Sequence, residues 1–186
     1  MRVIAGEYRS RILQAPRGTA TRPTSDRLRE TLFNIFGPRV EGSRFVDLYA
    51  GSGAVGIEAI SRGAEFVWFA ESARPASSTI RANLSALKIA GGFALEDRSV
   101  AKLLTSLAAK ERAADIVFLD PPYEAADEYE STLSFLAHNH AAVLADGAIV
   151  VAEHSSKHKL DARYGVLERT RLSAQGDAAL SFFEVK

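Results

Sequence analysis

The chain has 186 residues, of which 47% are hydrophobic and 25% charged, a composition typical of a soluble globular domain. This length supports one domain with, at most, a small appendage. The absence of cysteine excludes a disulfide framework, a thiolate zinc site and a cysteine nucleophile. No apolar run approaches the roughly 20 residues of a membrane span, and the polar start carries no secretory signal. We therefore expect a cytoplasmic protein.

Positive charge is concentrated at the front of the chain, although the net charge is zero, with 23 basic and 23 acidic residues. Residues 1–44 contain nine arginines, no lysine and four acids, a net charge of +5, and residues 45–186 carry −5. Such an asymmetry is typical of a protein that binds a polyanion. A solvated, arginine-rich surface would give the same count, so charge alone leaves both interpretations open.

The first 44 residues are predicted to form an appendage in front of the main domain. Two short strands, Arg2–Ile4 and Ser10–Leu13, would pair as a β-hairpin. A loop rich in Pro, Gly and Thr follows over residues 15–24. An amphipathic helix is predicted over Ser25–Phe36, because its apolar residues fall on one stripe.

Residues 45–186 alternate between strand and helix patterns. Strands are predicted at Phe45–Leu48, Phe66–Ala70, Phe93–Leu95, Ile116–Leu119, Ala148–Glu153, Val166–Arg171 and Leu180–Val185. Helices are predicted at Ala54–Ser61, Arg74–Leu87, Val100–Ala109, Tyr129–His138 and Ala141–Ala145. The alternation predicts an α/β fold with a mostly parallel, seven-stranded sheet, helices on both faces and an antiparallel C-terminal hairpin. No linker separates a second domain, so residues 45–186 are expected to form one domain and residues 1–44 an appendage that is not independent.

A glycine-rich turn follows the first strand of this domain. Gly51, Gly53 and Gly56 match the pattern G-x-G-x-x-G between a strand and a helix, and Glu71 lies 20 residues after the first glycine. Glycines let the backbone approach a nucleotide, and an acid at this distance can bind ribose hydroxyls. The pattern predicts a nucleotide-type site, although a tight turn alone would also use glycines.

Two further acids bear on which nucleotide binds. Asp47 stands just before the glycines, where its carboxylate would repel a diphosphate but would suit the ammonium and sulfonium groups of S-adenosylmethionine. The alternative for Asp47 is a loop acid that caps the following helix. Asp97, at the end of the third strand, could accept a hydrogen bond from adenine. Glu96 is an equally placed alternative, and a solvated turn is the third.

Asp120, Pro121, Pro122 and Tyr123 follow an apolar strand and form the most informative motif of the chain. Prolines fix φ and remove backbone donors, so this turn presents only acceptors. Asp120 adds a further acceptor, and two acceptors can hold an amino group and orient its lone pair. Tyr123 offers a flat face for stacking a base. An ordinary Pro-rich turn after a strand is the alternative.

These motifs resemble the class I, Rossmann-like S-adenosylmethionine-dependent methyltransferases that carry an (N/D)PPY motif. More closely, the chain resembles the RsmD family, which methylates the N2 amine of a guanine in 16S ribosomal RNA, guanine 966 in that family. The resemblance covers nearly the whole chain. The segments that carry it are residues 2–11, 21–34, 47–64 and 120–123.

The resemblance implies a cofactor site at one edge of the sheet. Asp47, Gly51 and Gly53 would hold the methionine end of S-adenosylmethionine, Glu71 would bind its ribose and Asp97 would meet its adenine. Two residues of the front segment, Arg22 and Thr24, would cap the pocket together with the helix that follows them, which places Asp26 and Arg29 nearby. Relatives often carry a second polar or acidic residue directly after the first acid, where this chain has Ser72.

The resemblance also implies the substrate site. Asp120, Pro121, Pro122 and Tyr123 would hold the target guanine as catalytic residues, and Asp120 would also lie against the cofactor. Asp120 or water would take the proton released on methylation. Five exposed or capping arginines of the front segment are predicted to bind RNA: Arg2, Arg9, Arg11, Arg17 and Arg27. The partner would be small-subunit ribosomal RNA within an assembling subunit.

Several alternatives stay open from the residues. A DNA adenine-N6 methyltransferase shares the DPPY motif but usually carries an additional recognition region. A protein glutamine methyltransferase usually reads NPPY, and a NAD-type dehydrogenase is disfavoured by Asp47. A non-catalytic nucleotide-binding module is the remaining alternative.

The four histidines show no metal spacing, so no metal is expected. Glu153 and His154 end a strand on the side of the predicted site, where a substrate contact and a solvated surface are both open. Relatives often read Tyr-Gly-Asp-Thr where residues 174–178 read Ala-Gln-Gly-Asp-Ala.

Overall fold

An eight-stranded sheet forms the centre of the part of the chain that the structure describes, in the order β3-β2-β1-β4-β5-β8-β7-β6. The computed structural model describes residues 1–16, 25–122 and 125–186. Its strands are β1 (Arg44–Leu48), β2 (Phe66–Ala70), β3 (Phe93–Glu96), β4 (Ala114–Leu119), β5 (Leu144–Ser155), β6 (Arg163–Tyr164), β7 (Leu167–Gln175) and β8 (Ala178–Val185). Strands β1 to β5 are parallel to one another, and β8, β7 and β6 continue the sheet in antiparallel pairs.

Six helices and one short 3-10 turn connect these strands within the described residues. They are α1 (Asp26–Phe36), η1 (Gly37–Val40), α2 (Ala54–Ser61), α3 (Arg74–Ala86), α4 (Val100–Ala109), α5 (Ala126–His138) and α6 (His140–Val143). Helix α1 begins where the Ser25 hydroxyl accepts a hydrogen bond from the Leu28 N–H at 3.1 Å. It ends at Gly37, whose φ of 56° suits glycine. In the described part of the chain, no helix is long and apolar enough to cross a membrane.

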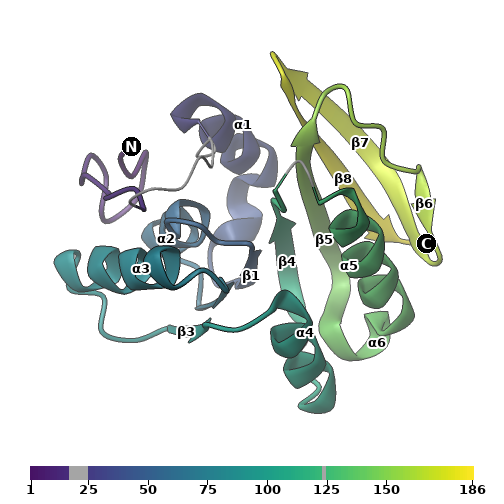
Figure 1. Cartoon of the computed structure of the whole chain (residues 1–186), viewed down its shortest axis with the longest axis horizontal. Helices are drawn as coiled ribbons and strands as arrows, with labels where there is room; N and C mark the ends of the chain where they lie inside the picture. Colours follow the sequence, from purple (N-terminus) through teal and green to yellow (C-terminus); the bar gives the residue numbers. More distant parts are fainter. Residues whose placement is uncertain (17–24, 123–124) are drawn as a thin grey trace.

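Helices cover both faces of the sheet (Figure 1). On one face, Phe45 and Phe118 of neighbouring strands are buried together with Phe33 of α1 and Ile80 of α3. The next residue along each strand points to the opposite face, where Leu119 packs in a second core with α4 and α5. The two cores confirm the predicted α/β arrangement.

The outer part of the sheet differs from the sequence prediction in one strand. The sequence predicted seven strands, and the structure has eight because residues Arg163–Tyr164 form β6, paired with β7 at the edge. Two residues are too few to show the alternation of period two by which a strand is recognised. The antiparallel hairpin at the C-terminus is confirmed, with β8 placed between β5 and β7.

The predicted N-terminal hairpin is reduced to a single antiparallel bridge between Arg2 and Ile12. The backbone N–H groups of Ile4 and Ala5 instead donate to the carboxylate of Glu58 in α2, at 2.8 and 3.0 Å. The two arms of the front segment are also joined by backbone hydrogen bonds from the N–H groups of Val3, Ser10 and Leu13, so the segment keeps the hairpin path without a regular strand ladder. Val3 and Leu13 of this segment are buried in the same core as α1.

Candidate active site at the carboxyl ends of the strands

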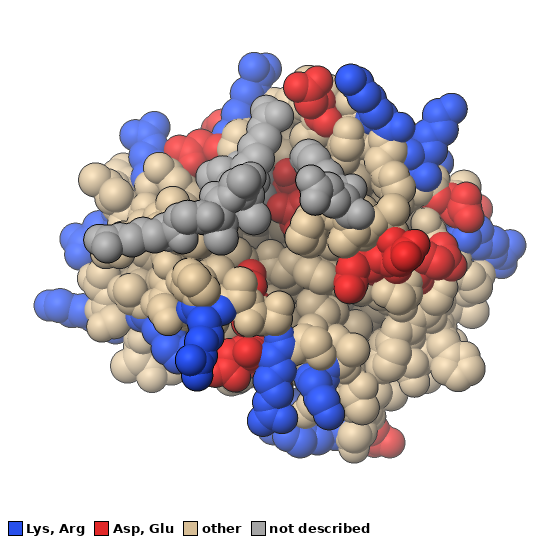
Figure 2. Space-filling view, viewed as in Figure 1, with Lys and Arg blue, Asp and Glu red and all other residues tan. Residues whose placement is uncertain are grey.

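The predicted site residues gather where the parallel strands end, which we call the carboxyl edge. In the register of the sheet, Leu48 of β1 pairs with Leu119 of β4, and Leu119 pairs with Ala152 of β5. Strand β1 lies between β2 and β4, so the strand order reverses there. In open parallel sheets ligands bind at such a reversal, outside the carboxyl ends of the strands. Figure 2 shows a hollow on this side of the molecule, with acidic side chains visible inside it.

The glycine turn combines an open approach with close packing. A Cβ atom at Gly51 would meet no other atom within 4 Å, so a ligand can approach the backbone there. At Gly56 a Cβ would lie 2.2 Å from the Phe69 ring, so α2 packs against β2 only because this residue is glycine. Gly53 has φ of 77° and caps α2. These are the three roles that a nucleotide-binding glycine turn requires.

Asp47 is almost fully buried beneath this turn. Its Oδ2 accepts a hydrogen bond from the Gly56 N–H at 2.8 Å, so it anchors the first turn of α2. Burial raises the pKa of Asp47 to about 7, opposed by the Gly56 hydrogen bond, and the neighbouring Glu71 charge raises that pKa further. The interpretation of Asp47 as a helix cap is therefore confirmed. A cationic ligand would stabilise the charged form of the same carboxyl.

Glu71, predicted to bind ribose, reaches the glycine turn. Its Oε2 accepts from the Gly51 N–H at 2.9 Å, and its Oε1 accepts from the Ala73 N–H at 2.7 Å. The carboxylate thus joins the end of β2 to the turn after β1. A ribose bound here would share these oxygens with the backbone.

Asp97 lies beyond the end of β3 and is 54% exposed. Its Oδ2 accepts a hydrogen bond from the Arg81 guanidinium of α3 at 3.2 Å. The alternative residue, Glu96, is paired with Arg98 at 3.5 Å. The structure therefore distinguishes the two acids by their partners, and the adenine contact of Asp97 stays a prediction.

The Asp-Pro-Pro turn continues directly from β4. The Asp120 N–H is 3.4 Å from the Leu48 carbonyl oxygen of β1, so the turn starts beside the strand that leads to the glycines. Pro121 is buried, Pro122 is exposed, and the Ala125 N–H donates to the Pro122 carbonyl at 2.8 Å. Tyr123 lies outside the described residues, and its predicted stacking role stays a prediction.

Tyr49 connects the turn after β1 to helix α5, a link that the sequence analysis did not predict. It has φ of 62°, rare for a residue with a side chain and a form of strain that concentrates at functional sites. Its hydroxyl donates to Glu128 at 2.6 Å and lies 2.9 Å from the Thr132 hydroxyl, both in α5. Burial and the Glu128 charge raise the pKa of Tyr49 well above its usual value. No pattern in the sequence pairs residues that are about 80 positions apart.

Asn83 of α3 joins the front segment to the glycine turn. Its Nδ2 donates to the Ser52 carbonyl at 3.0 Å and to the Gln14 carbonyl at 3.1 Å, and its Oδ1 accepts from the Gln14 N–H at 2.8 Å. Residues just before position 17 are therefore held against the glycine turn. The predicted capping residues Arg22 and Thr24 lie outside the described residues.

Arg29, expected near the pocket, is instead a buried anchor. It is fully buried in α1, its Nη2 donates to Asp26 and to the Arg2 carbonyl, and its Nε is 3.7 Å from the Glu58 carboxylate. Arg62 pairs with the same carboxylate at 2.8 Å. Glu58 thus joins α1, α2 and the front segment, a role for which the sequence held no signal.

The predicted RNA-binding arginines that the structure describes are all exposed. Arg2, Arg9 and Arg11 lie on the front segment and Arg27 on α1, while Arg17 lies outside the described residues. Figure 2 shows basic side chains mainly around the outline of this face. This arrangement leaves the four described arginines accessible to a polyanion.

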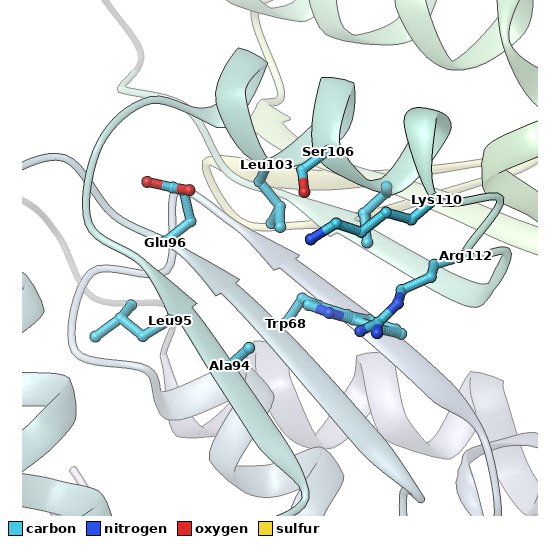
Figure 3. Close-up of a pocket in the computed structure, with 9 residues that line it drawn as sticks. Trp68, Ala94, Leu95, Glu96, Leu103, Ser106, Lys110 and Arg112 are labelled. Atoms are coloured by element: carbon cyan, nitrogen blue, oxygen red, sulfur yellow. The ribbon is translucent and has the colours of Figure 1, made fainter.

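A separate cavity of about 170 Å³ lies between β3 and α4 (Figure 3). Trp68, Leu103, Lys110 and Arg112 are among the residues that line it, and Glu96 stands at one end. Of the acids considered for the cofactor, Glu96, the alternative to Asp97, lines this cavity, and none of the other residues predicted to bind the cofactor or the substrate does. Among the described residues, no group of three or more His, Asp or Glu side chains could hold a metal ion.

Solved structures identify the class of protein. The Escherichia coli protein yhhF superposes with a TM-score of 0.82 at 33% identity, over 100% of this chain and 98% of that chain. SMU.776, solved with SAH bound, has a TM-score of 0.67 at 14% identity, over 86% of this chain and 48% of that chain, and shares the fold. The strand order and the glycine turn are those of a class I, Rossmann-like methyltransferase.

Sequence comparisons identify the family. Residues 1–184 match the family described as conserved hypothetical protein 95. Ribosomal RNA small subunit methyltransferase D of E. coli K12 is 36% identical over 160 residues, 86% of this chain and 77% of that protein. YlbH of Bacillus subtilis strain 168 is 35% identical over 184 residues, 99% of this chain and 98% of that protein. The chain belongs to this family, the RsmD family that its motifs resemble.

Proposed function

We propose that this protein transfers a methyl group from S-adenosylmethionine to the N2 amine of a guanine in small-subunit ribosomal RNA, guanine 966 in the family. The observation that carries the proposal is the placement of the Asp120-Pro-Pro turn beside the glycine turn, one strand away at the same edge. The E. coli relative is named for methylation of small-subunit ribosomal RNA, and the enzyme would act in the cytoplasm, where subunits assemble.

The residues present suit S-adenosylmethionine. Gly51 leaves its side of the turn open, Asp47 provides a carboxylate for a cationic group, and Glu71 provides oxygens at the ribose position. Asp97 would meet the adenine from the end of β3. When bound, the cofactor supplies a methyl group on a positively charged sulfur. The carboxyl groups of Asp47 and Glu71 would favour that positive charge.

Asp120 and the proline carbonyls would hold the target amine. Acceptors on both N–H bonds orient the nitrogen lone pair toward the methyl carbon, and their attraction grows as the nitrogen gains positive charge. The nitrogen forms the new bond to carbon while the old carbon–sulfur bond breaks and its electron pair stays on sulfur. Asp120 or water then takes the proton from nitrogen. The base must be unstacked to reach this position.

A tritium-transfer assay tests the proposal against its alternatives. Label from the cofactor is offered to naked RNA, DNA and assembled or partly assembled small subunits, and the product nucleoside is identified. Label in N2-methylguanine of small-subunit RNA supports the proposal. Label in DNA adenine would favour the DNA methyltransferase, and cofactor binding without any transfer would favour a binding module.

Cofactor affinity is expected to rise with pH and to level off above about 7. Because burial raises the pKa of Asp47 to about 7, its carboxyl is mostly neutral below that pH and cannot pair with the cofactor ammonium. Each pH unit well below the pKa should weaken S-adenosylhomocysteine binding about tenfold, measured by calorimetry between about pH 5 and 8.

Asp47→Asn is the control for this pH profile, because it keeps an acceptor for the Gly56 N–H without a titrating group. The affinity of this variant for S-adenosylhomocysteine should be low and should not change with pH.

The raised pKa of Asp47 also affects the stability of the cofactor-free protein. The neutral carboxyl favours folding at low pH, and this contribution is lost as the pH rises toward about 7. A wild-type affinity that does not change with pH would contradict the assignment.

We propose that residues 1–44 form an RNA-binding appendage of the methyltransferase domain at 45–186. Arg9 and Arg11 stand exposed on the front segment, so replacing both with glutamine should weaken every RNA about equally. Each lost phosphate contact flattens the log–log salt dependence by about 0.7 to 0.9, so the double variant should lose one to two units. Binding measured over a range of salt concentrations gives this slope.

The matched control replaces Lys110 and Arg112, two exposed cations just before β4, at the opposite edge of the sheet. This pair removes the same charge and should leave the salt slope unchanged. If both double variants behaved like the wild type, the front segment would be a solvated surface without a role in RNA binding.

A further inference from the structure

A second buried carboxyl group lies beside the Asp120 turn. Leu119, the last residue of β4, pairs with Ala152 of β5, and continuing this parallel register by one residue places Asp120 beside Glu153. Paired strands lie about 4.8 Å apart. Glu153 lies at the carboxyl edge of the sheet, next to the start of the Asp120 turn. Its exposed fraction is nevertheless only 4%.

The alternation of side chains along β4 and β5 assigns both carboxyl groups to the same face of the sheet. Phe118 and Val151, two positions earlier in their strands, are buried in the core that includes α1. Since side chains repeat with period two along a strand, Asp120 and Glu153 continue these two rows at the carboxyl edge. Asp47 lies two positions after Phe45, which belongs to the same core. The three acids therefore share the face on which the glycine turn opens.

The backbone of Glu153 is fixed by contacts on the opposite face. The Tyr129 hydroxyl of α5 donates to the Glu153 carbonyl at 2.9 Å. The next residue, His154, is buried with its Nε2 2.9 Å from the Ser181 hydroxyl of β8. Helix α5 follows the Asp120 turn directly, so the position of Glu153 relative to that turn is set by rigid elements.

We infer that Glu153 is a specificity-determining residue that accepts the N1–H of the target guanine while Asp120 accepts from its N2 amine. The inference rests on the proposed function. The Watson–Crick edge of guanine carries two adjacent donors, N1–H and the N2 amine, and two neighbouring carboxyl groups match that pair. Adenine presents an acceptor at N1, next to its own amine. A carboxylate at this position would therefore repel adenine and admit guanine.

The test uses small-subunit RNA with guanine or 2-aminopurine at the methylated position. 2-Aminopurine keeps the N2 amine but has an acceptor at N1. The wild type should prefer guanine by at least about a hundredfold in kcat/KM. Glu153→Gln should lower the rate on guanine about 10- to 100-fold. The new amide can donate to N1 of 2-aminopurine, so the ratio of kcat/KM for guanine over 2-aminopurine should fall by tenfold or more. Affinity for S-adenosylhomocysteine should not change.

Two further variants make the result decisive. Glu168→Gln, on the exposed side of β7, removes one carboxylate elsewhere and should keep the wild-type preference. Glu153→Asp keeps the charge but shortens the side chain, and it should also narrow the preference if Glu153→Gln does not fold. An unchanged preference for guanine over 2-aminopurine in a folded Glu153 variant would overturn this inference but not the proposed function. Methylation of adenine rather than guanine by the wild type would overturn the proposed function together with it.

Discussion

Asp120→Ala is expected to reduce methyl transfer by about 100- to 1,000-fold or more, while affinity for S-adenosylhomocysteine stays within a few fold of the wild type. Asp120 is proposed to hold the substrate amine, whose positive charge develops only as the bond to the methyl carbon forms. Its removal therefore acts on the transition state more than on cofactor binding. Transfer is measured with tritiated cofactor and affinity by calorimetry.

Asp127→Ala provides a matched control for this loss. Asp127 is an exposed acid in the first turn of α5, only a few residues further along the chain. Its removal changes the local charge equally but should leave transfer close to the wild-type rate. Turnover by Asp120→Ala near the wild-type rate would show that the catalytic assignment is wrong.

Glu58→Ala is expected to lower the free energy of unfolding by about 3 to 5 kcal/mol, because the fully buried Arg29 then keeps only the half-exposed Asp26 as an acidic partner. Glu58 and Arg29 are both fully buried. The carboxylate also accepts from the N–H groups of Ile4 and Ala5 and from Arg62. Urea unfolding of the cofactor-free protein measures the loss.

Glu65→Ala is the control, since Glu65 is an exposed acid in the connection between α2 and β2, and its effect should stay within about 0.5 kcal/mol. Replacing Arg29 and Glu58 together with leucine should recover part of the loss, because no fully buried charge then remains, while Arg62 and Asp26 both reach solvent. A Glu58→Ala variant as stable as Glu65→Ala would show that the buried cluster does not hold the front segment in place.

The sequence alone determined the elements of the parallel sheet and the groups at its carboxyl edge. Helices α2 and α4 have the predicted bounds because their apolar periodicity and their flanking turns are local signals. The sequence also assigned Glu71 and Gly51 to one site, and the two residues are in contact. A strand, a helix and a parallel strand must return the chain to the same edge, so the 20-residue spacing already implies proximity.

The residues that connect these elements become apparent only once the chain is folded. Tyr49 reaches Glu128, Asn83 reaches Gln14, and Glu58 holds the front segment. Such pairs are separated by more than 50 positions, and their side chains meet only after the helices have packed on the sheet. Local periodicity carries no information about such contacts. The same reason explains why the burial of Glu153 beside Asp120 follows from the pairing of β4 and β5 and not from either strand alone.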